Sequence, residues 1–537
     1  MKKERTVVLT IDGYGSAGEG VGRLDGQAVF VKGALRGETC RVRLDKVGKR
    51  AAWGTVVEVL TPSSHRVAPD CPQFPTCGGC ALRHMDYAEE LRYKRGRVED
   101  ALRRIGGWAG TVETIHGAAE PDRYRNKIQF PVADGPRIGF YRARSHEVID
   151  APDCRLQPEQ ATRLRAAFRD WMVRYAVPAY DERAHAGLIR HLYVRVDRAG
   201  RSLCAVVANG DRLPHTAELI DLLRAAEPEL VGLVLSVNTA KTNVILGTRY
   251  ETLWGRDHLE DTLCGLSFRL SVPSFYQVNR AQTEVLYGRA LELAGLTGTE
   301  TALDLYCGIG TITLCLARGA KRALGAEVVP EAVEDARRNA ARNQIANAEF
   351  FCADAGQAAL RLAAEGVRPD VITVDPPRKG LSPEVIEAVA QMAPRRLVYV
   401  SCDPGTLARD MALLRERGYE LRTAEAVDLF PRTHHVETVC LLSKLQSKEH
   451  IEIEVKMDEL DLTSAESKAT YDEIKAYVLE KHGLKVSSLY ISQVKRKCGL
   501  DVGQNYNLSK KEDAKVPQCP PEKEAAIMDA LKHFQMI

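Results

Sequence analysis

Three reactive side chains follow predicted strands in the second half of this 537-residue chain. Asp375 ends the strand-like run DVITVD, Cys402 ends LVYVSC, and Glu437 directly precedes the apolar run TVCLL. In open α/β sheets, ligands bind at the rim formed by the carboxyl ends of the strands. We therefore expect an acid, a thiol and a second acid beside one ligand crevice, with the thiol as a candidate nucleophile.

The position of Cys402 alone leaves two interpretations open. Free cysteine is often no more than a small buried hydrophobe. Cys402, however, is followed by Asp403, Pro404 and Gly405 at a strand end, where burial is not the expected fate. A catalytic thiol and a structural thiol are equally compatible with this position. Four other cysteines are expected to be buried structural residues: Cys307, Cys315, Cys352 and Cys440.

A glycine loop joins a strand to a helix in LDLYCGIGTITLCLA. Gly308 and Gly310 let the backbone turn tightly and approach a ligand. The next predicted strand ends in Glu327, 23 positions after Asp304, where a carboxylate can accept hydrogen bonds from ribose hydroxyls. A third strand ends at Asp354, which is suitably placed for an adenine amine.

The loop lacks one glycine of the G-x-G-x-x-G pattern that cradles a pyrophosphate. After Gly310 come Thr311, Ile312 and Thr313 in place of the third glycine. A ligand without pyrophosphate is therefore favoured over a nicotinamide dinucleotide. S-adenosylmethionine is the obvious candidate.

A second group of cysteines lies upstream, with the spacing Cys71-x5-Cys77-x2-Cys80. Cys154 is the nearest downstream cysteine that could complete a set of four ligands. Four thiolates suit zinc or an iron–sulfur cluster, and the spacing alone leaves both open. A single C-x2-C knuckle makes a zinc-only site the less favoured of the two. Radical chemistry with S-adenosylmethionine is not indicated, because it needs C-x3-C-x2-C and an open iron.

Three segments of different pattern must position these residues. Residues 1–60 contain alternating runs (VVLTI, QAVFVKG, TCRVRL and GTVVEVL) joined by turns such as DGYGSAGEGVGRLDG, which predicts a small β-barrel. Residues 61–280 form an expected α+β domain with the cysteine site, and its strand-like runs are KIQFPV, RIGFYR, HLYVRV, LCAVVA, LVLSVN and TNVILG. Residues 281–445 alternate helices and strands, which is typical of a parallel doubly wound sheet. The segment at about 85–118 is expected to pack with this last domain.

Residues 446–537 are expected to form a small, mostly helical extension. HIEIEVKM indicates one strand, and DELDLTSAESKA indicates a polar linker. Thr470 and Glu473 form a capping box for a helix that ends at Gly483, and further helices are predicted in VSSLYISQVKRKCG and PEKEAAIMDALKHF. The basic run 495–497 could contact phosphates or simply be solvated, so no function is assigned to this extension.

The composition excludes several classes of protein. With 45% hydrophobic and 27% charged residues the chain is typical of soluble globular proteins. No apolar run approaches a membrane span and no signal peptide is indicated, so a cytoplasmic location is expected. The balance of 75 Lys+Arg against 72 Asp+Glu neither indicates nor excludes a nucleic-acid partner. Fourteen cysteines without an export signal argue for reduced thiols.

Five motifs, taken together, resemble those of a known family. SFYQVN (274–279), LDLYCGIG, VDPPRKG, VSCDPGTLARD and FPRTHHVETV resemble the RNA uracil-5-methyltransferase family, particularly its 23S ribosomal RNA branch. The N-terminal strands resemble the TRAM domain of that branch, an OB-like β-barrel that binds RNA. The resemblance covers about residues 1–445 and implies a Rossmann-like class I methyltransferase domain in a multidomain α/β protein.

The resemblance implies a role for each reactive residue. Cys402 would add to carbon 6 of uracil, which makes carbon 5 nucleophilic enough to take a methyl group. Glu437 resembles the base that removes the carbon 5 proton, and Asp375 resembles the residue that hydrogen-bonds the uracil edge. Tyr306 and Thr311 stand where relatives often have Phe and Asn. The residues implied for the methyl donor are Gln277, Tyr306, Thr311, Glu327, Asp354 and Asp375, with Gly308 and Gly310 in the loop.

The resemblance also implies a cluster and a partner. It selects a 4Fe–4S cluster, structural or supporting RNA binding, whose ligands would be Cys71, Cys77, Cys80 and Cys154. The implied partner is 23S rRNA with a looped or flipped-out uridine, and a monomer without an obligate protein partner is expected. One alternative is a tRNA enzyme, although that bacterial branch generally lacks the TRAM domain and the cysteines. Another is a catalytically silent RNA-binding or iron-sensing protein, against which the intact Cys402, Glu437 and Asp375 argue.

Overall fold

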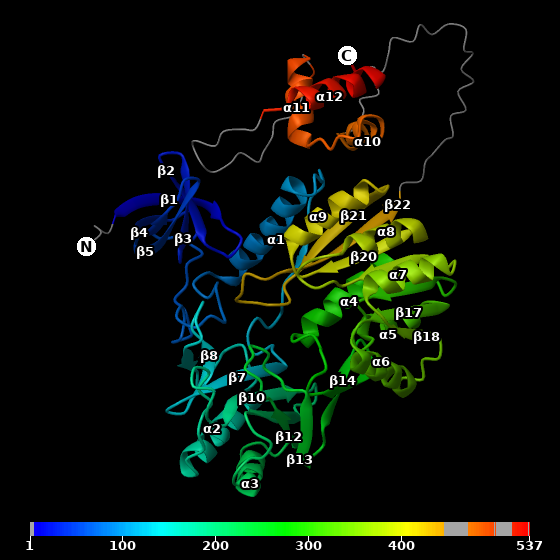
Figure 1. The fold of residues 1–537 in the computed structure, drawn as a ribbon. Coiled ribbons are helices and arrows are strands. Elements are labelled where there is room, and N and C mark those ends of the chain that lie inside the picture. Colours follow the sequence, from blue (N-terminus) through cyan, green and yellow to red (C-terminus); the bar gives the residue numbers. More distant parts are fainter. Residues whose placement is uncertain (1–4, 445–470, 499, 501–517, 535) are drawn as a thin grey trace. The chain divides into compact units, whose positions relative to one another are not determined.

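The computed structural model describes residues 5–444, 471–498, 500, 518–534 and 536–537 (Figure 1). The chain divides into two compact units, Met1–Gln446 and Ser447–Ile537, and each has its own core. Among the described residues, no helix is long and apolar enough to cross a membrane.

A closed five-stranded barrel begins the first unit, as the N-terminal pattern predicts. The assignment of Gly20–Leu24 to a turn is wrong, because this segment is a strand paired with both of its neighbours. Glycine is typical of turns, but here it permits close packing: a Cβ on Gly22 would lie 2.7 Å from the carbonyl oxygen of Thr10. The strands are β1 (Thr6–Tyr14), β2 (Gly20–Leu24), β3 (Gln27–Lys32), β4 (Thr39–Val47) and β5 (Ala51–Thr61).

A seven-stranded sheet with helices α2 (Glu159–Arg174) and α3 (Thr216–Ala226) forms the central part, in the order β13-β12-β11-β10-β7-β8-β9. TNVILG does not form the expected strand. The Asn238 side-chain amide donates to the carbonyl oxygens of Val244 and Ile245, which curls this segment into a loop, and β13 follows it. The strands are β7 (Lys127–Ala133), β8 (Arg137–Tyr141), β9 (Val148–Asp150), β10 (Ile189–Val196), β11 (Ser202–Ala208), β12 (Leu230–Val237) and β13 (Arg249–Gly255).

The expected doubly wound sheet is present, with eight strands in the order β18-β17-β16-β19-β20-β22-β21-β6. The five strands from β18 to β20 run parallel, and β22 is antiparallel to β20. Its strands are β6 (Ile115–His116), β16 (Thr301–Leu305), β17 (Arg322–Glu327), β18 (Ala348–Cys352), β19 (Val371–Val374), β20 (Arg396–Ser401), β21 (Tyr419–Val427) and β22 (Glu437–Lys444).

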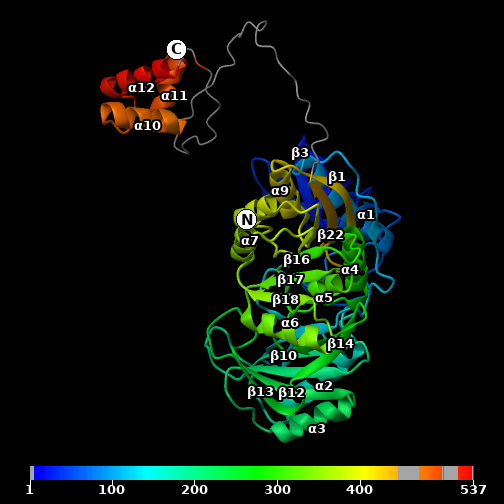
Figure 2. The same ribbon diagram turned by 90° about the vertical axis from the view of Figure 1, so that its right-hand side faces the viewer.

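Helices cover both faces of this sheet, and each face has its own apolar cluster. Figure 2 shows α4 and α5 on one side of β16–β18 and α7 on the other. Buried leucine, valine and alanine side chains of the helices fill both layers. The helices are α4 (Arg280–Ala294), α5 (Thr311–Ala317), α6 (Pro330–Arg342), α7 (Ala355–Ala364), α8 (Pro383–Met392) and α9 (Pro404–Arg415).

One early segment belongs to the doubly wound part by its contacts. Helix α1 (Tyr87–Arg104) packs on α9, and β6 pairs in parallel with the edge strand β21. Val98 and Leu102 of α1 lie in the same apolar cluster as the sheet. A separate hairpin of β14 (His258–Leu263) and β15 (Leu266–Ser271) packs on α6.

The second unit contains three described helices, α10 (Tyr471–His482), α11 (Ser488–Lys497) and α12 (Pro521–His533). They share a core that includes Ile474, Val478, Ile491 and Ile527. Lys497 contacts Glu524 of α12 at 2.7 Å, so part of the basic run serves the unit itself. The expected strand HIEIEVKM, the polar linker and Thr470 lie outside the described residues.

Candidate active site

The strand register brings Cys402, Glu437 and Asp375 to one rim of the sheet. Ser401 of β20 pairs with Thr438 of β22, so Cys402 leaves one strand where Glu437 enters the next. Val374 of β19 pairs with Tyr399 of β20, which places Asp375 beyond the neighbouring strand end. Both carboxyl groups act electrostatically on the Cys402 thiol. The three side chains therefore share one local environment.

Burial gives both acids pKa values near neutrality. Glu437 is only 4% exposed, and burial, together with repulsion from Asp375, raises its pKa to about 8. Burial and the nearby Asp304 carboxyl raise the pKa of Asp375 to about 7. Arg378 acts in the opposite direction on the pKa of Glu437. An acid with a pKa near the working pH can both take and release a proton, as acid–base catalysis requires.

The Cys402 thiol is half-buried and protonated in the resting protein. Burial, then the charges of Glu437 and Asp375, raises its pKa to about 11, while Arg378 lowers it. Asp403 caps helix α9, because its Oδ1 accepts the backbone N–H groups of Gly405 and Thr406 at 2.9 and 3.0 Å. The positive end of that helix therefore lies next to Cys402 and favours a thiolate there.

Glu437→Gln is expected to stabilise the folded protein at alkaline pH. Burial raises the pKa of Glu437 from its usual 4.5 to about 8. The protonated carboxyl contributes to the free energy of unfolding. This contribution is complete below the unfolded-state pKa and is lost as pH rises through the folded-state pKa. Glutamine does not titrate, so the variant does not lose this contribution. The difference in unfolding temperature between variant and wild type, measured by calorimetry, should therefore grow in favour of the variant between about pH 5 and pH 9.

The matched control is Glu349→Gln at a surface ion pair. Arg322 donates to Glu349 at 2.8 Å and lowers the pKa of this carboxyl below its usual 4.5. Its effect on stability therefore changes only below that pH, and this variant should show no pH trend relative to wild type between about pH 5 and pH 9. Equal pH trends for the Glu437 and Glu349 variants would contradict the buried, protonated state of Glu437.

The glycine loop has the strained geometry that its sequence predicts. Gly308 and Gly310 have φ values of +55° and +84°, and a Cβ on Gly310 would lie 3.1 Å from the ring of Phe350. Tyr306, which is not a glycine, also has a positive φ of +71°. Buried Asp304 accepts hydrogen bonds from the hydroxyls of Thr313 and Thr373 and so ties the loop to the sheet.

The two carboxylates expected to contact the donor stand at the adjacent strand ends, β17 and β18, and are fixed by backbone amides. Glu327 accepts from the N–H groups of Gly308 at 3.0 Å and of Val328 at 2.9 Å. Asp354 caps α7 by accepting from the N–H of Gly356 at 2.9 Å. Because each carboxylate retains unused acceptor positions, both stay available to hydroxyl or amine groups of a ligand.

Tyr287 is a site residue that sequence reasoning misses. It lies in the middle of α4, in a run without any motif, and its hydroxyl is 3.2 Å from Thr311 Oγ1. Burial and the Asp375 carboxyl raise its pKa well above the usual value. Tyr287 thus interacts both with Thr311 after the glycine loop and with Asp375. Gln277 is half-buried, and its backbone carbonyl accepts from the Asn126 side chain at 2.8 Å.

A groove of about 730 Å³ lies between the barrel and α1 and reaches the residues that follow Cys402. Asp12–Ser16 of the barrel line one part of it and Asp403–Gly405 another. Four acids also border it, but the five arginines outnumber them; the acids are Asp12, Glu99, Asp100 and Asp403. These arginines are Arg36, Arg92, Arg97, Arg103 and Arg104.

The four expected cluster cysteines line one cavity of about 260 Å³, namely Cys71, Cys77, Cys80 and Cys154. In the described part of the chain, no group of three or more His, Cys, Asp or Glu side chains is spaced to hold a single metal ion.

The surroundings of this cavity act on its thiols in two directions: burial raises the pKa of Cys77, Cys80 and Cys154, while nearby donors and cations favour the thiolate. The backbone N–H of Gly79 lies 3.4 Å from Cys77 Sγ, and an N–H donor of this kind stabilises a thiolate. Four cationic side chains line the same cavity and can balance the charge of bound thiolates: Arg83, Arg125, Lys127 and Arg155. Of the cysteines expected to be buried, Cys307, Cys315 and Cys440 are buried, whereas Cys352 is exposed at a strand end, so that expectation was wrong.

Comparison with known proteins gives two family matches. The model of the tRNA (Uracil-5-)-methyltransferase family matches residues 240–445, and the TRAM domain model matches residues 2–57. An uncharacterized RNA methyltransferase of Clostridium tetani is 43% identical over 82% of this chain and 97% of its own length. One of Halalkalibacterium halodurans is 43% identical over 82% and 98%.

A solved structure is also similar. The crystal structure of Pyrococcus abyssi tRNA (uracil-54, C5)-methyltransferase in complex with S-adenosyl-L-homocysteine has a TM-score of 0.66 and 26% identity. The similarity covers 81% of this chain and 100% of that one. Both family models end by residue 445, so the second unit lies outside them.

Proposed function

Because the chain belongs to the RNA (uracil-5-)-methyltransferase family, we propose that it methylates carbon 5 of a uridine in RNA through a covalent bond to Cys402. The observation that carries this proposal is the convergence of Cys402, Glu437 and Asp375 at one rim of the class I sheet. The methyl donor is S-adenosylmethionine, in keeping with the glycine loop and with the ligand of the Pyrococcus abyssi structure.

The covalent route answers a chemical need. Carbon 5 of uracil is too weak a nucleophile to attack a methyl donor directly. The Cys402 thiol first loses its proton to solvent. The thiolate then adds to carbon 6, and the electron pair of the 5,6 double bond moves toward the carbon 4 oxygen. Asp375, with a pKa raised to about 7, can hydrogen-bond the uracil edge where this charge collects. Carbon 5 then attacks the methyl group of S-adenosylmethionine, the bond between that methyl and the sulfonium sulfur breaks, and S-adenosylhomocysteine leaves.

Glu437 completes the reaction by removing a proton. After methylation, carbon 5 carries both the methyl group and its original hydrogen. The Glu437 carboxylate takes this proton, the electron pair restores the 5,6 double bond, and the bond between carbon 6 and sulfur breaks to release the Cys402 thiolate. Because the pKa of Glu437 is raised to about 8, the carboxylate form increases with pH through that value, and release of product should accelerate accordingly.

Residues at the ends of β16, β17 and β18 would hold the donor. The carboxylates of Glu327 and Asp354 are held in place by backbone N–H groups and would accept hydrogen bonds from hydroxyl and amine groups of the donor. Gly308 and Gly310 let the backbone approach the ligand closely. The complete proposed set is Gln277, Tyr306, Thr311, Glu327, Asp354, Asp375, Gly308 and Gly310.

The arginine-lined groove is the proposed path of the RNA strand. It extends from the TRAM barrel to Asp403–Gly405, next to the nucleophile, and arginine is a preferred partner of phosphates. A uridine in a paired stem could not reach Cys402, so the substrate is a looped or flipped-out uridine. We propose 23S rRNA as the substrate, on the likeness of the motifs to that branch and on the four cysteines.

tRNA is the second candidate, and one observation favours it. The Pyrococcus abyssi enzyme is named for uracil 54 of tRNA, and all of its chain aligns with 81% of this one. An alignment of that extent is compatible with a tRNA enzyme that also contains the N-terminal barrel. The barrel alone is therefore weak support for rRNA.

The cavity with four thiols is the proposed site of a 4Fe–4S cluster. Cys71, Cys77, Cys80 and Cys154 would be its ligands, and their thiols line a single cavity. When bound, the cluster would cross-link the segments that carry these cysteines. No step of the methyl transfer involves it.

Trapping with 5-fluorouridine RNA tests the proposed function. Fluorine at carbon 5 blocks the proton removal, so the wild-type protein with S-adenosylmethionine should form an adduct that survives denaturation. RNA binding without any adduct would instead identify a silent RNA-binding protein. Mapping of 5-methyluridine in rRNA and tRNA, with and without the gene, then identifies the substrate; a loss confined to tRNA would overturn the choice of 23S rRNA.

A further inference from the structure

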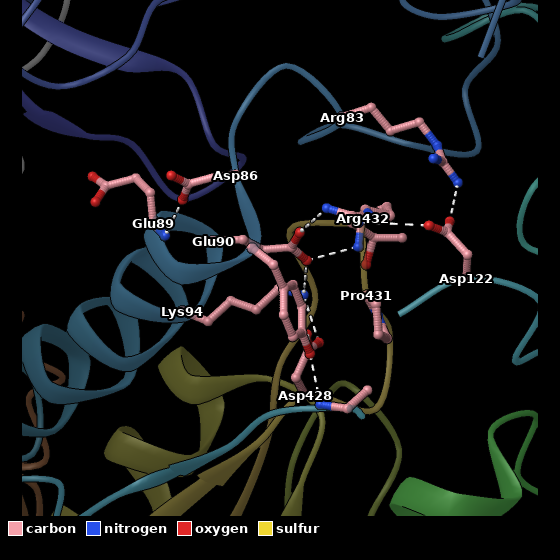
Figure 3. A network of polar contacts seen from close by, with 12 residues as sticks. Arg83, Asp86, Glu89, Glu90, Lys94, Asp122, Asp428, Pro431 and Arg432 are labelled. Atoms are coloured by element: carbon pink, nitrogen blue, oxygen red, sulfur yellow. Dashed lines mark hydrogen bonds and ion pairs between the residues drawn. The ribbon is translucent and has the colours of Figure 1, made fainter. Parts of the chain in front are cut away.

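The loop between β21 and β22, residues Asp428–Val436, leads directly into Glu437. It is called the 428–436 loop below. The position of this loop therefore determines the position of the Glu437 backbone. Two elements far away in the sequence hold it: helix α1 and the segment that carries Cys77 and Cys80 (Figure 3).

Arg432, in the middle of this loop, has a strained backbone that is held on both sides. Its φ is +69°, a left-handed conformation that disfavours any residue with a Cβ. The N–H of Arg432 donates to Glu90 Oε1 at 2.6 Å. Its carbonyl oxygen accepts from the N–H groups of Ala81 and Leu82 at 2.9 and 3.1 Å. Strain of this kind persists only where the surroundings enforce it, and it collects at functional sites.

The Arg432 side chain adds ionic contacts to α1 and to Asp122, which follows β6. Its guanidinium lies 3.7 Å from Glu90 and 3.5 Å from Asp122. Asp122 in turn accepts a 2.5 Å hydrogen bond from Arg83, whose side chain is almost fully buried. Figure 3 shows this series of contacts from Arg83 through Asp122 to Arg432 and Glu90. Arg83 also interacts with Cys80, so the series begins at the cavity with four thiols.

The beginning of the loop is anchored as well. Lys94 Nζ donates to Asp428 Oδ1 at 2.6 Å and to the carbonyl oxygen of Phe430 at 3.1 Å. The hydroxyl of Tyr124 donates to the carbonyl oxygen of Pro431 at 3.1 Å. The segment 428–432 is thus fixed at four of its five residues, and only Thr433–Val436 separate it from Glu437.

We propose that Arg432 is a positioning residue for Glu437, held by the segment 80–83 and by α1 so that the 428–436 loop presents the base to carbon 5 of the uracil. This inference rests on the proposed function. It assigns to the residues that follow Cys80 a part in the final proton removal. Loss of the guanidinium contacts to Glu90 and Asp122 loosens the loop and lets Glu437 move away from the bound uracil.

The order of chemical steps makes this inference testable. Bond formation at carbon 6 and methylation precede the proton removal by Glu437. A displaced Glu437 therefore leaves the methylated RNA bound to Cys402, whereas general unfolding removes all steps alike. The diagnostic quantity is the rate of adduct release relative to the rate of adduct formation.

Arg432→Gly is the main variant, because glycine accepts the left-handed backbone. The variant removes the guanidinium contacts to Glu90 and Asp122. In single-turnover reactions with uridine RNA, the denaturation-resistant adduct should accumulate and its release should slow by about tenfold or more. Adduct formation with 5-fluorouridine RNA should stay within about twofold of wild type. Asp122→Asn, which weakens one anchor without touching the loop, should give a smaller effect of the same kind.

Gln344→Gly is the matched control. Gln344 follows α6, is exposed, and has a φ of +56°, so this variant also relieves a left-handed backbone in the same unit. Its adduct release should equal that of wild type. Unchanged release in Arg432→Gly, or loss of both steps in equal proportion, overturns the inference. If wild type itself forms no adduct with 5-fluorouridine RNA, the proposed function fails instead.

Discussion

Cys402→Ala is expected to abolish both methylation and the covalent adduct, with a fall in rate of roughly 10⁴-fold or more, as for other nucleophile deletions. Without the thiolate, carbon 5 of uracil never becomes nucleophilic, and no other described side chain at the rim can replace sulfur chemically. Donor binding and the unfolding temperature should stay near wild type, because Cys402 is half-buried and a thiol leaves only a small gap.

The measurements are methyl incorporation into RNA, gel detection of the adduct, and donor binding by calorimetry. Cys519→Ala is the control, since it removes a half-buried thiol from the second unit. It should behave as wild type in all three assays. Substantial methylation by Cys402→Ala would contradict the covalent route and would leave Asp375 and Glu437 to be explained by another mechanism.

Lys94→Met is expected to lower the free energy of unfolding by about 3–5 kcal/mol, the usual cost of breaking a buried ion pair from one side. Lys94 is fully buried and contacts two buried carboxyl groups, Glu90 at 2.8 Å and Asp428 at 2.6 Å. Methionine fills the same space but removes the cation that the two acids share, and leaves Glu90 with its 3.7 Å ion pair to Arg432. Urea unfolding followed by tryptophan fluorescence measures the loss.

Two further variants separate lost charge from lost packing. Adding Glu90→Gln and Asp428→Asn to Lys94→Met should restore much of the stability, because no buried charge is then left unpaired. Arg361→Met, at a surface pair in which Arg361 is 74% exposed, should change stability little. A Lys94→Met protein as stable as wild type would mean that the network in Figure 3 contributes little to the fold.

Much of the candidate site could be predicted from the sequence because it depends on local pattern. Asp375, Cys402 and Glu437 each border an apolar run of strand length, and the strand order of a doubly wound sheet brings such ends to one rim. The glycine loop is equally local, since Gly308 and Gly310 have the positive φ that their position requires. In these cases a few neighbouring residues determine the geometry.

Other features depend on distant contacts and leave no local signal. The strand at Gly20–Leu24 has the composition of a turn, and only its close packing against β1 explains it. Tyr287 sits in an ordinary helical run and becomes a site residue only when α4 packs over the rim. Arg432 has a left-handed backbone because Glu90, which is 342 residues away, accepts its N–H. No pattern within a short window contains such information.

The two-residue strand β6 can pair only after most of the chain has been synthesised. Ile115 pairs with Ala426 of β21, so about 300 residues must follow β6 before its partner exists. At about 5–20 residues per second this takes roughly 15–60 s on the ribosome. During that interval Val98 and Leu102 of α1 lack the sheet that buries them. The nascent chain therefore exposes the apolar face of α1 until β21 and its neighbouring strands emerge.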